Sequence, residues 1–192
     1  MSPRTKEQYE KIRQEKKALI QEAALKLFAT EGYHSSSISK IAKAAGTSKG
    51  LLYNYFDSKE TLLQEVLLEG IHELTLHFDP NHDGNLTQEE AEYYVRSTFQ
   101  LMKENLSYWK LYFSLLTQPQ VLDFAMEHLL SMVGPIMEIT NNYFKSKGVK
   151  NPEAHTRTFI AILDGVGLHY LIDTENFPLD DVIDLLIEKF IH

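Results

Sequence analysis

The sequence has 192 residues, of which 43% are hydrophobic and 24% charged, an ordinary balance for a globular chain that buries a sizeable core. It has no apolar run long enough to cross a bilayer and no cysteine, which excludes a transmembrane protein, a disulfide scaffold, thiolate zinc sites and a cysteine nucleophile. The first residues form no apolar signal-peptide segment, so the cytoplasm is the expected location.

The net charge of -8 is unevenly distributed along the chain. Residues 1–60 carry 11 Lys and Arg against 7 Asp and Glu, a net of +4, whereas residues 61–192 carry 8 against 20, a net of -12. A basic end on an acidic body indicates that one end meets a polyanion while the other keeps the molecule soluble.

The hydrophobic pattern predicts an all-α fold. Apolar residues recur at i, i+3, i+4 and i+7 along most of the chain, and no segment alternates with period two. Glycine, proline and capping serine or threonine residues separate the predicted helices. These helices span residues 9–30, 38–45, 49–56, 59–78, 87–105, 107–117, 119–147, 152–173 and 179–191.

The segment 37–56 has the proportions of a helix-turn-helix, because two short predicted helices are separated by Gly46, Thr47 and Ser48. Gly46 permits the left-handed turn residue. In the second helix we expect Leu51, like the apolar residues near it, to point mainly inward. Short polar side chains at the start of such a helix suit entry into the DNA major groove, and tyrosine hydroxyls suit phosphate oxygens. An ordinary helical hairpin with capping serines would give the same spacing.

Residues 16–68 resemble the DNA-binding unit of the TetR family of bacterial transcriptional regulators. The shared motifs are Ala23–Phe28 followed by Gly32 and Tyr33, Ser37 to Gly46, Ser48 to Phe56, and Ser58 to Leu63. The resemblance implies a three-helix DNA-binding domain in residues 1–60 and a C-terminal helical bundle in residues 61–192 for effector binding and dimerisation. Leu51 stands where the family often has a small polar residue or threonine, which leaves the base preference open.

Together, the outward face of the second helix and the resemblance define one set of residues expected to contact a double-stranded DNA operator. The set comprises Ser37, Thr47, Ser48, Lys49, Gly50, Tyr53, Asn54, Tyr55 and Lys59. The protein would then be a repressor that leaves its operator when a small molecule enters the C-terminal bundle.

The second half of the chain carries many aromatic and methionine residues on consecutive predicted helices, and the simplest interpretation assigns them to the core. The resemblance implies that several instead line an apolar cavity for the effector, since methionine packs adaptably around varied ligands. The candidate lining residues are Trp109, Tyr112, Phe113, Met126, Met132 and Met137. The sequence does not identify the ligand.

The last two predicted helices indicate a homodimer. Both carry an apolar stripe, and Gly165 and Gly167 would allow two helices to approach closely. One short recognition helix binds weakly alone, whereas two helices about 34 Å apart read a palindrome. Packing of both helices within one chain is the alternative interpretation.

One loop does not fit the TetR resemblance. Residues 79–90 match the spacing of a twelve-residue EF-hand calcium loop, with a central glycine for the sharp turn and a closing glutamate. The predicted calcium ligands are Asp79, Asn81, Asp83, Asn85, Thr87 and Glu90. Thr87 and Glu90 also form the pattern of a capping box, and no second loop of this kind is present. A calcium-binding interaction module without sequence-specific DNA binding is therefore the alternative function.

The sequence shows no pattern typical of an enzyme. Its eight histidines form no HExxH pair, and no Ser-His-Asp order, phosphate-cradling glycine-rich loop or carboxylate pair is present. We therefore expect no enzymatic activity.

Overall fold

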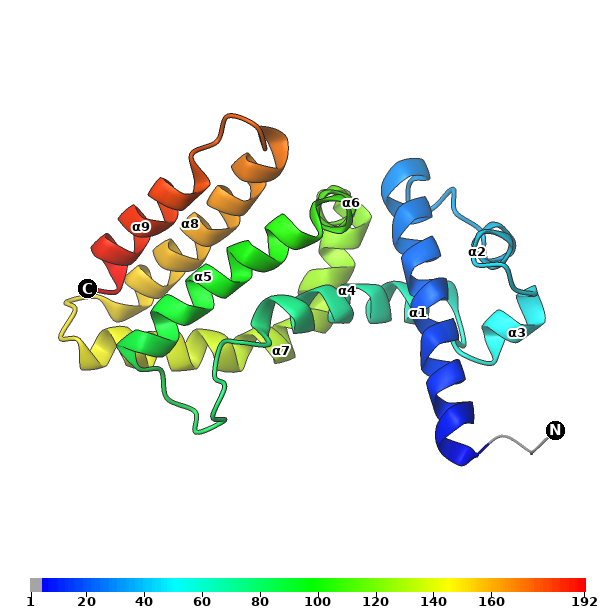
Figure 1. Ribbon diagram of the computed structural model, residues 1–192, viewed down its shortest axis with the longest axis horizontal. Coiled ribbons are helices and arrows are strands. Elements are labelled where there is room, and N and C mark those ends of the chain that lie inside the picture. The colour runs from blue at the N-terminus through cyan, green and yellow to red at the C-terminus, as the bar shows by residue number, and fades with distance from the viewer. Residues whose placement is uncertain (1–4) are drawn as a thin grey trace. The chain divides into compact units, whose positions relative to one another are not determined.

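The computed structural model describes residues 5–192, apart from the side chains of residues 129–131. Every regular element in this part of the chain is an α-helix, which confirms the predicted fold class (Figure 1). The helices are α1 (Lys6–Glu31), α2 (Ile38–Ala44), α3 (Lys49–Tyr53), α4 (Lys59–Thr75), α5 (Gln88–Glu104), α6 (Leu106–Leu116), α7 (Pro119–Ser146), α8 (Pro152–Ile172) and α9 (Leu179–Phe190).

Helix α1 begins at a capping box, in which the Thr5 side chain and the Gln8 side chain each bind the other residue's backbone N–H. It ends at Gly32, whose φ of 88° lies in the left-handed region that favours glycine. The sequence pattern places Ile12 and Leu19 on the apolar stripe of this helix, yet both are exposed. Burial begins at Ile20, where the helix first packs against the interior.

The chain divides into two compact units, the first comprising residues 1–70 and 111–126 and the second residues 71–110 and 127–192. The boundary predicted after residue 60 differs from this division, since α4, α6 and α7 each contribute residues to both units. Sequence periodicity does not reveal such a division, because it depends on contacts between segments far apart in the chain.

The first unit shows such a contact between α4 and α6. The Tyr112 hydroxyl donates a hydrogen bond to the Leu67 carbonyl oxygen at 2.9 Å, and the tyrosine is fully buried. Its ring lies against Gly70 so closely that a Cβ there would overlap the ring. Gly70 is therefore required for α4 and the 111–126 segment to pack together.

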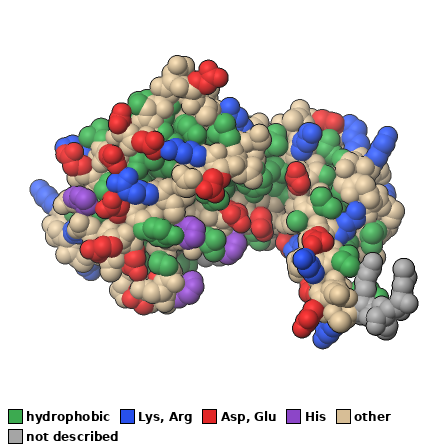
Figure 2. All heavy atoms as spheres, in the orientation of Figure 1, with side chains coloured by type: hydrophobic (Ala, Val, Ile, Leu, Met, Phe, Trp, Pro, Cys, Tyr) green, Lys and Arg blue, Asp and Glu red, His purple; other side chains and the backbone are tan. Residues whose placement is uncertain are grey.

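In the second unit, α5, α8 and α9 pack side by side around apolar residues such as Val95, Phe159 and Ile183 (Figure 1). Arg96 also pairs with Asp184 at 2.8 Å, although exposed ion pairs of this kind stabilise a fold little. Figure 2 shows acidic side chains spread over the visible face of this unit, as its net negative charge requires. Within residues 5–192, no helix combines the length and apolar character needed to cross a membrane.

Candidate nucleic-acid interface

Helices α2 and α3 form the compact pair that the sequence predicted. The Ser37 hydroxyl oxygen accepts a hydrogen bond from the Lys40 backbone N–H at 3.3 Å, and the Ser48 oxygen accepts one from the Leu51 N–H at 3.1 Å. Each serine therefore caps its helix. Gly46 between the helices has a φ of 59°, the left-handed conformation expected at this turn.

The outer face of α3 presents unpaired hydrogen-bond donors. Lys49, Gly50 and Asn54 are exposed, and Tyr53 is exposed beside the Lys49 ammonium, which lies 5.9 Å from its ring centre. Among the described residues Lys49 forms no ion pair, so its charge is available to a polyanion. The space around Gly50 is open, so another backbone can approach α3 closely there.

Three more of the predicted residues lie at the margin of this face. Ser37 and Ser48 use their hydroxyl oxygens as caps, yet each O–H remains able to donate to a phosphate. Tyr55 is half-buried, and the Arg13 guanidinium lies 5.7 Å from the centre of its ring. The cap bonds and the packing thus hold all three side chains in fixed positions.

Thr47 and Lys59, two of the predicted DNA contacts, have intramolecular surroundings that differ from those of the exposed residues of α3. The Thr47 hydroxyl oxygen is buried without a hydrogen-bond partner among the described residues, so it does not face solvent. The Lys59 ammonium donates a hydrogen bond to the Tyr33 carbonyl oxygen at 3.1 Å and lies 4.3 Å from the Tyr33 ring centre. Lys59 therefore fastens α4 to the loop between α1 and α2.

Leu51 also differs from expectation, because it is 40% exposed on α3. Leu52 and Phe56 take the inward positions and are fully buried. Adjacent residues of a helix point in different directions, so the burial of Leu52 turns Leu51 toward the outer face of α3. Leu51 gives the outer face an apolar site, which matches the methyl group of thymine in the major groove.

Sequence reasoning missed Lys16, which helps to hold the turn between α2 and α3. Its ammonium donates hydrogen bonds to the carbonyl oxygens of Ala45 and Gly46, both at 3.2 Å. These oxygens lie at the C-terminal end of α2, where a cation also interacts favourably with the helix dipole. No signal in the sequence separates Lys16 from its neighbours, because its partners lie 29 and 30 residues further along the chain.

Tyr33 also joins the loop between α1 and α2 to helix α4. Its hydroxyl donates a hydrogen bond to Glu60 Oε1 at 3.2 Å. Burial, and then the nearby Glu60 charge, raise the pKa of Tyr33. A hydrogen bond from its own backbone, and further ones from Ser58 and Tyr33, lower the pKa of Glu60. Glu60 therefore stays ionised at neutral pH, and the loop that leads into α2 is held at two points.

The six predicted effector-pocket residues are divided between the two units. Tyr112, Phe113 and Met126 belong to the first unit, whereas Trp109, Met132 and Met137 belong to the second. Tyr112 is the packing residue described above, and Met126 is 55% exposed. Trp109 is buried, and Met132 and Met137 are half-buried.

The predicted calcium loop is closed by hydrogen bonds among its own residues. Asp79 Oδ2 accepts from the Gly84 N–H at 3.0 Å, and Asn81 Nδ2 donates to Glu90 Oε1 at 2.9 Å. The capping box of Thr87 and Glu90 is present. Within the described chain, no group of three or more His, Cys, Asp or Glu side chains is arranged to hold a metal ion. The capping box that the sequence also offered is therefore part of this loop.

A stripe of small and apolar residues lies uncovered on α8. Ala161, Gly165, Leu168 and Ile172 follow one another at intervals of four, three and four residues, the spacing of one helix face, and Ile172 is 72% exposed. A Cβ added at Gly165 would meet no atom within 4 Å. Gly167, by contrast, is buried within its own unit, so Gly165 is the glycine of the two that lies on this stripe.

Comparison with known proteins supports the DNA-binding interpretation. Residues 20–66 match the family described as bacterial regulatory proteins of the tetR family, which agrees with the resemblance predicted for residues 16–68. An uncharacterized HTH-type transcriptional regulator of Bacillus subtilis (strain 168), YuxN, is 57% identical over 53 residues, which is 28% of this chain and 18% of that protein. The fatty acid metabolism regulator protein of the same organism is 46% identical over 50 residues, 26% of each chain. The matched segments thus span less than a third of either relative's length.

Solved structures match over most of the chain. FadR from Bacillus subtilis, in complex with stearoyl-CoA, has a TM-score of 0.71 at 20% identity and covers 91% of this chain and 97% of its own. NalD, the secondary repressor of the MexAB-OprM multidrug efflux pump in Pseudomonas aeruginosa, has a TM-score of 0.70 at 22% identity, with 93% and 95% covered. The chain therefore shares the all-α fold of these transcriptional regulators.

Proposed function

We propose that this protein is a TetR-family transcriptional repressor that binds operator DNA as a homodimer and leaves it when a small molecule binds the second unit. The observation that carries the proposal is the capped α2–α3 pair, whose outer face exposes Lys49, Gly50, Tyr53 and Asn54. The tetR-family match over residues 20–66 supports it, and it favours this function over a calcium-binding module without DNA recognition.

Operator binding is tested with duplexes selected in vitro by the unmutated protein. We expect Lys49→Ala to weaken binding to operator and random-sequence duplexes alike, because a lysine that contacts phosphate carries no sequence information. Binding should also weaken steeply with salt. Fluorescence anisotropy measures both effects. Failure of the unmutated protein to select any duplex, or salt-independent binding, would contradict the proposal.

The effector is proposed to enter the second unit beside Trp109, Met132 and Met137. Trp109 is the chain's single tryptophan and is buried, so its fluorescence reports directly on that interior. Stearoyl-CoA is a suitable first probe because a regulator of the same fold is solved in complex with it. We expect an apolar effector to shift the Trp109 emission and to release the operator at the same concentration. An emission shift without operator release would contradict effector control.

We also propose that residues 79–90 bind calcium. The supporting observation is the hydrogen bond between Asn81 and Glu90, which brings together the third and twelfth positions of the loop. His82 and Gly84 have left-handed backbones, with φ of 56° and 74°, and they turn the chain around the loop centre. Calcium would replace the loop's internal hydrogen bonds with oxygen ligands, and its flexible coordination suits this loop better than the octahedral geometry of magnesium.

Calorimetric titration of chelator-treated protein with calcium tests this proposal. Glu90→Gln is the informative variant, because glutamine preserves the capping box with Thr87 while it removes the carboxylate. We expect the unmutated protein to bind calcium and the variant to lose that binding without losing helix α5. If the unmutated protein gives no binding heat at millimolar calcium, or if the variant binds equally well, the loop is only a capped turn.

A further inference from the structure

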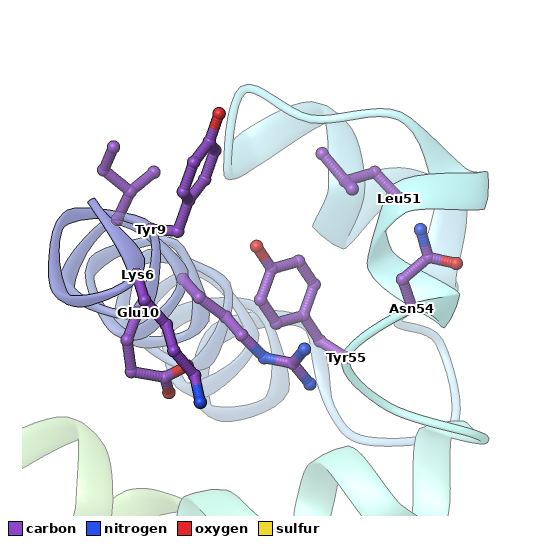
Figure 3. Close-up of a pocket in the computed structure, with 8 residues that line it drawn as sticks. Lys6, Tyr9, Glu10, Leu51, Asn54 and Tyr55 are labelled. Carbon is purple, nitrogen blue, oxygen red and sulfur yellow. The ribbon is translucent and has the colours of Figure 1, made fainter. Parts of the chain in front are cut away.

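A groove in the first unit adjoins the DNA-facing surface of α3. Five of its lining residues come from the first turns of α1, and three come from α3 and the residues that follow it. Its volume is about 460 Å³. In Figure 3, Lys6 and Tyr9 lie on the α1 side, Leu51 and Asn54 on the α3 side, and Tyr55 between the two. We call this feature the α1–α3 groove.

The polar lining of the groove consists mainly of hydrogen-bond donors. These are the Lys6 ammonium, the Arg13 guanidinium, the Tyr9 and Tyr55 hydroxyls and the Asn54 amide. The single carboxylate in the lining, that of Glu10, accepts a hydrogen bond from Gln14 at 2.9 Å. Within residues 5–192, neither Lys6 nor Arg13 forms an ion pair. The groove is therefore cationic and suits an anion.

The position of Arg13 is fixed by its neighbour. Its guanidinium lies 5.7 Å from the centre of the Tyr55 ring, a distance at which the ring face attracts a cation. A planar guanidinium held in this way can donate two parallel hydrogen bonds to one phosphate group. Arg13 therefore loses less conformational freedom on binding a phosphate than a mobile surface lysine loses.

The rest of the lining is apolar and uncovered. Tyr9 is 59% exposed, and Ile12 and Leu51 are also exposed. A cationic groove with apolar walls matches the chemistry of a DNA strand, in which anionic phosphates alternate with the hydrocarbon face of deoxyribose. Asn54 and Tyr55 belong both to this groove and to the face of α3 predicted to meet DNA, so the two surfaces are continuous.

We infer that the α1–α3 groove binds the sugar-phosphate backbone of the operator next to the segment that α3 reads, with Lys6 and Arg13 as its phosphate contacts. The inference rests on the proposed function and extends it to α1, which the sequence assigned only to packing. Because phosphates are the same at every base pair, this contact adds affinity and fixes the orientation of α3 without selecting sequence.

The experiment compares Lys6→Ala, Arg13→Ala and Lys11→Ala by fluorescence anisotropy with operator and random duplexes over a series of salt concentrations. Lys11 is the matched control, because it is exposed on the same helix, has the same charge as Lys6 and does not line the groove. Each lost phosphate contact should reduce the slope of log K against log salt by about 0.9, and a substitution in a homodimer removes two such contacts, so the slope should fall by about 1.8. We expect that reduction for Lys6→Ala and Arg13→Ala, equally on both duplexes, and not for Lys11→Ala.

Lys49→Ala distinguishes a failure of the groove proposal from a failure of the proposed DNA-binding function. If it weakens DNA binding while Arg13→Ala and Lys6→Ala behave like Lys11→Ala, the groove does not bind DNA and the proposed function stands. If the unmutated protein binds neither duplex, both proposals are overturned. Arg13→Lys provides a further check, since it retains the charge and should keep the salt slope while losing affinity through the missing second hydrogen bond. A slope reduced as far as that of Arg13→Ala would contradict the assigned phosphate contact.

Discussion

The effect of replacing Gly70 on the stability of the protein depends on the residues around it. In an open helix, replacing glycine with alanine stabilises a protein by about 1 kcal/mol. At Gly70, the new methyl group would overlap the Tyr112 ring. We therefore expect Gly70→Ala to lower the free energy of unfolding by about 1–3 kcal/mol, the usual cost of overpacking. Urea denaturation followed by circular dichroism measures the change.

Gly134 is the matched control for that substitution. It lies inside α7, and a Cβ added there would meet no atom within 4 Å. Gly134→Ala should therefore stabilise the protein, so the two substitutions are expected to have opposite signs. Equal stabilisation by both would show that Tyr112 does not lie against α4.

At the residue scale, the sequence predicted the exposed side chains of α3, whose positions depend on local structure. Lys49, Gly50 and Asn54 are exposed as expected, because their positions follow from the turn at Gly46 and the cap at Ser48. The hydrogen bond from Lys59 was not predicted, because its carbonyl partner lies in a loop more than twenty residues earlier in the chain. Motif matching gives a residue type and a spacing, whereas it does not show which donors the fold already uses.

At the element scale, helix boundaries followed from local chemistry. The predicted start of α5 at Thr87 coincides with an observed capping box, and the break after α7 coincides with Gly148, whose φ is 73°. The predicted burial of α1 was only half correct, since Ile12 and Leu19 have the right period yet lack a covering element. Periodicity identifies a helix and its apolar face, but the extent of burial depends on which other elements reach that face.

Gln118, in the turn between α6 and α7, joins that turn to the end of α1. Its Nε2 donates a hydrogen bond to the Phe28 carbonyl oxygen at 2.7 Å, and its Oε1 accepts one from the Tyr33 N–H at 3.0 Å. We expect Gln118→Met, which keeps the side-chain length, to lose both bonds and speed hydrogen exchange at the Tyr33 amide. Hydrogen-exchange mass spectrometry on residues 29–36 measures this effect.

Gln118→Glu separates the two hydrogen bonds. The carboxylate still accepts from the Tyr33 N–H, but it cannot donate to the Phe28 carbonyl oxygen. Exchange at Tyr33 should therefore remain slower than in Gln118→Met. Unchanged exchange in both variants would mean that the turn does not hold the end of α1.

At the scale of the whole molecule, the uncovered stripe on α8 predicts the oligomeric state. Leu168 is 39% exposed and Ile172 even more so, and burying such side chains against a second copy is favourable. We expect Leu168→Glu to convert a dimer into a monomer, because a charge would be buried without a partner. Light scattering coupled to size-exclusion chromatography measures the mass.

Leu122→Glu is the control for the dimer prediction. Leu122 lies on α7 in the first unit and is 49% exposed, so its substitution changes the surface chemistry equally without touching α8. A dimeric Leu168→Glu protein, or a monomeric unmutated protein, would show that α8 is not the contact between copies. Gly167 is unsuitable for this test, since its burial within one chain would confuse dissociation with unfolding.

The brevity of α3 has a consequence for how a protein of this kind can change its target. A helix of five residues has almost no stability of its own, so its shape and aim depend on the buried Leu52 and Phe56 and on Lys16 at the preceding turn. Substitutions at those positions would change the orientation of the outer face of α3 without altering any side chain on it. Target preference could therefore drift through changes in the interior, and two relatives with identical outer residues on this helix need not regulate the same genes.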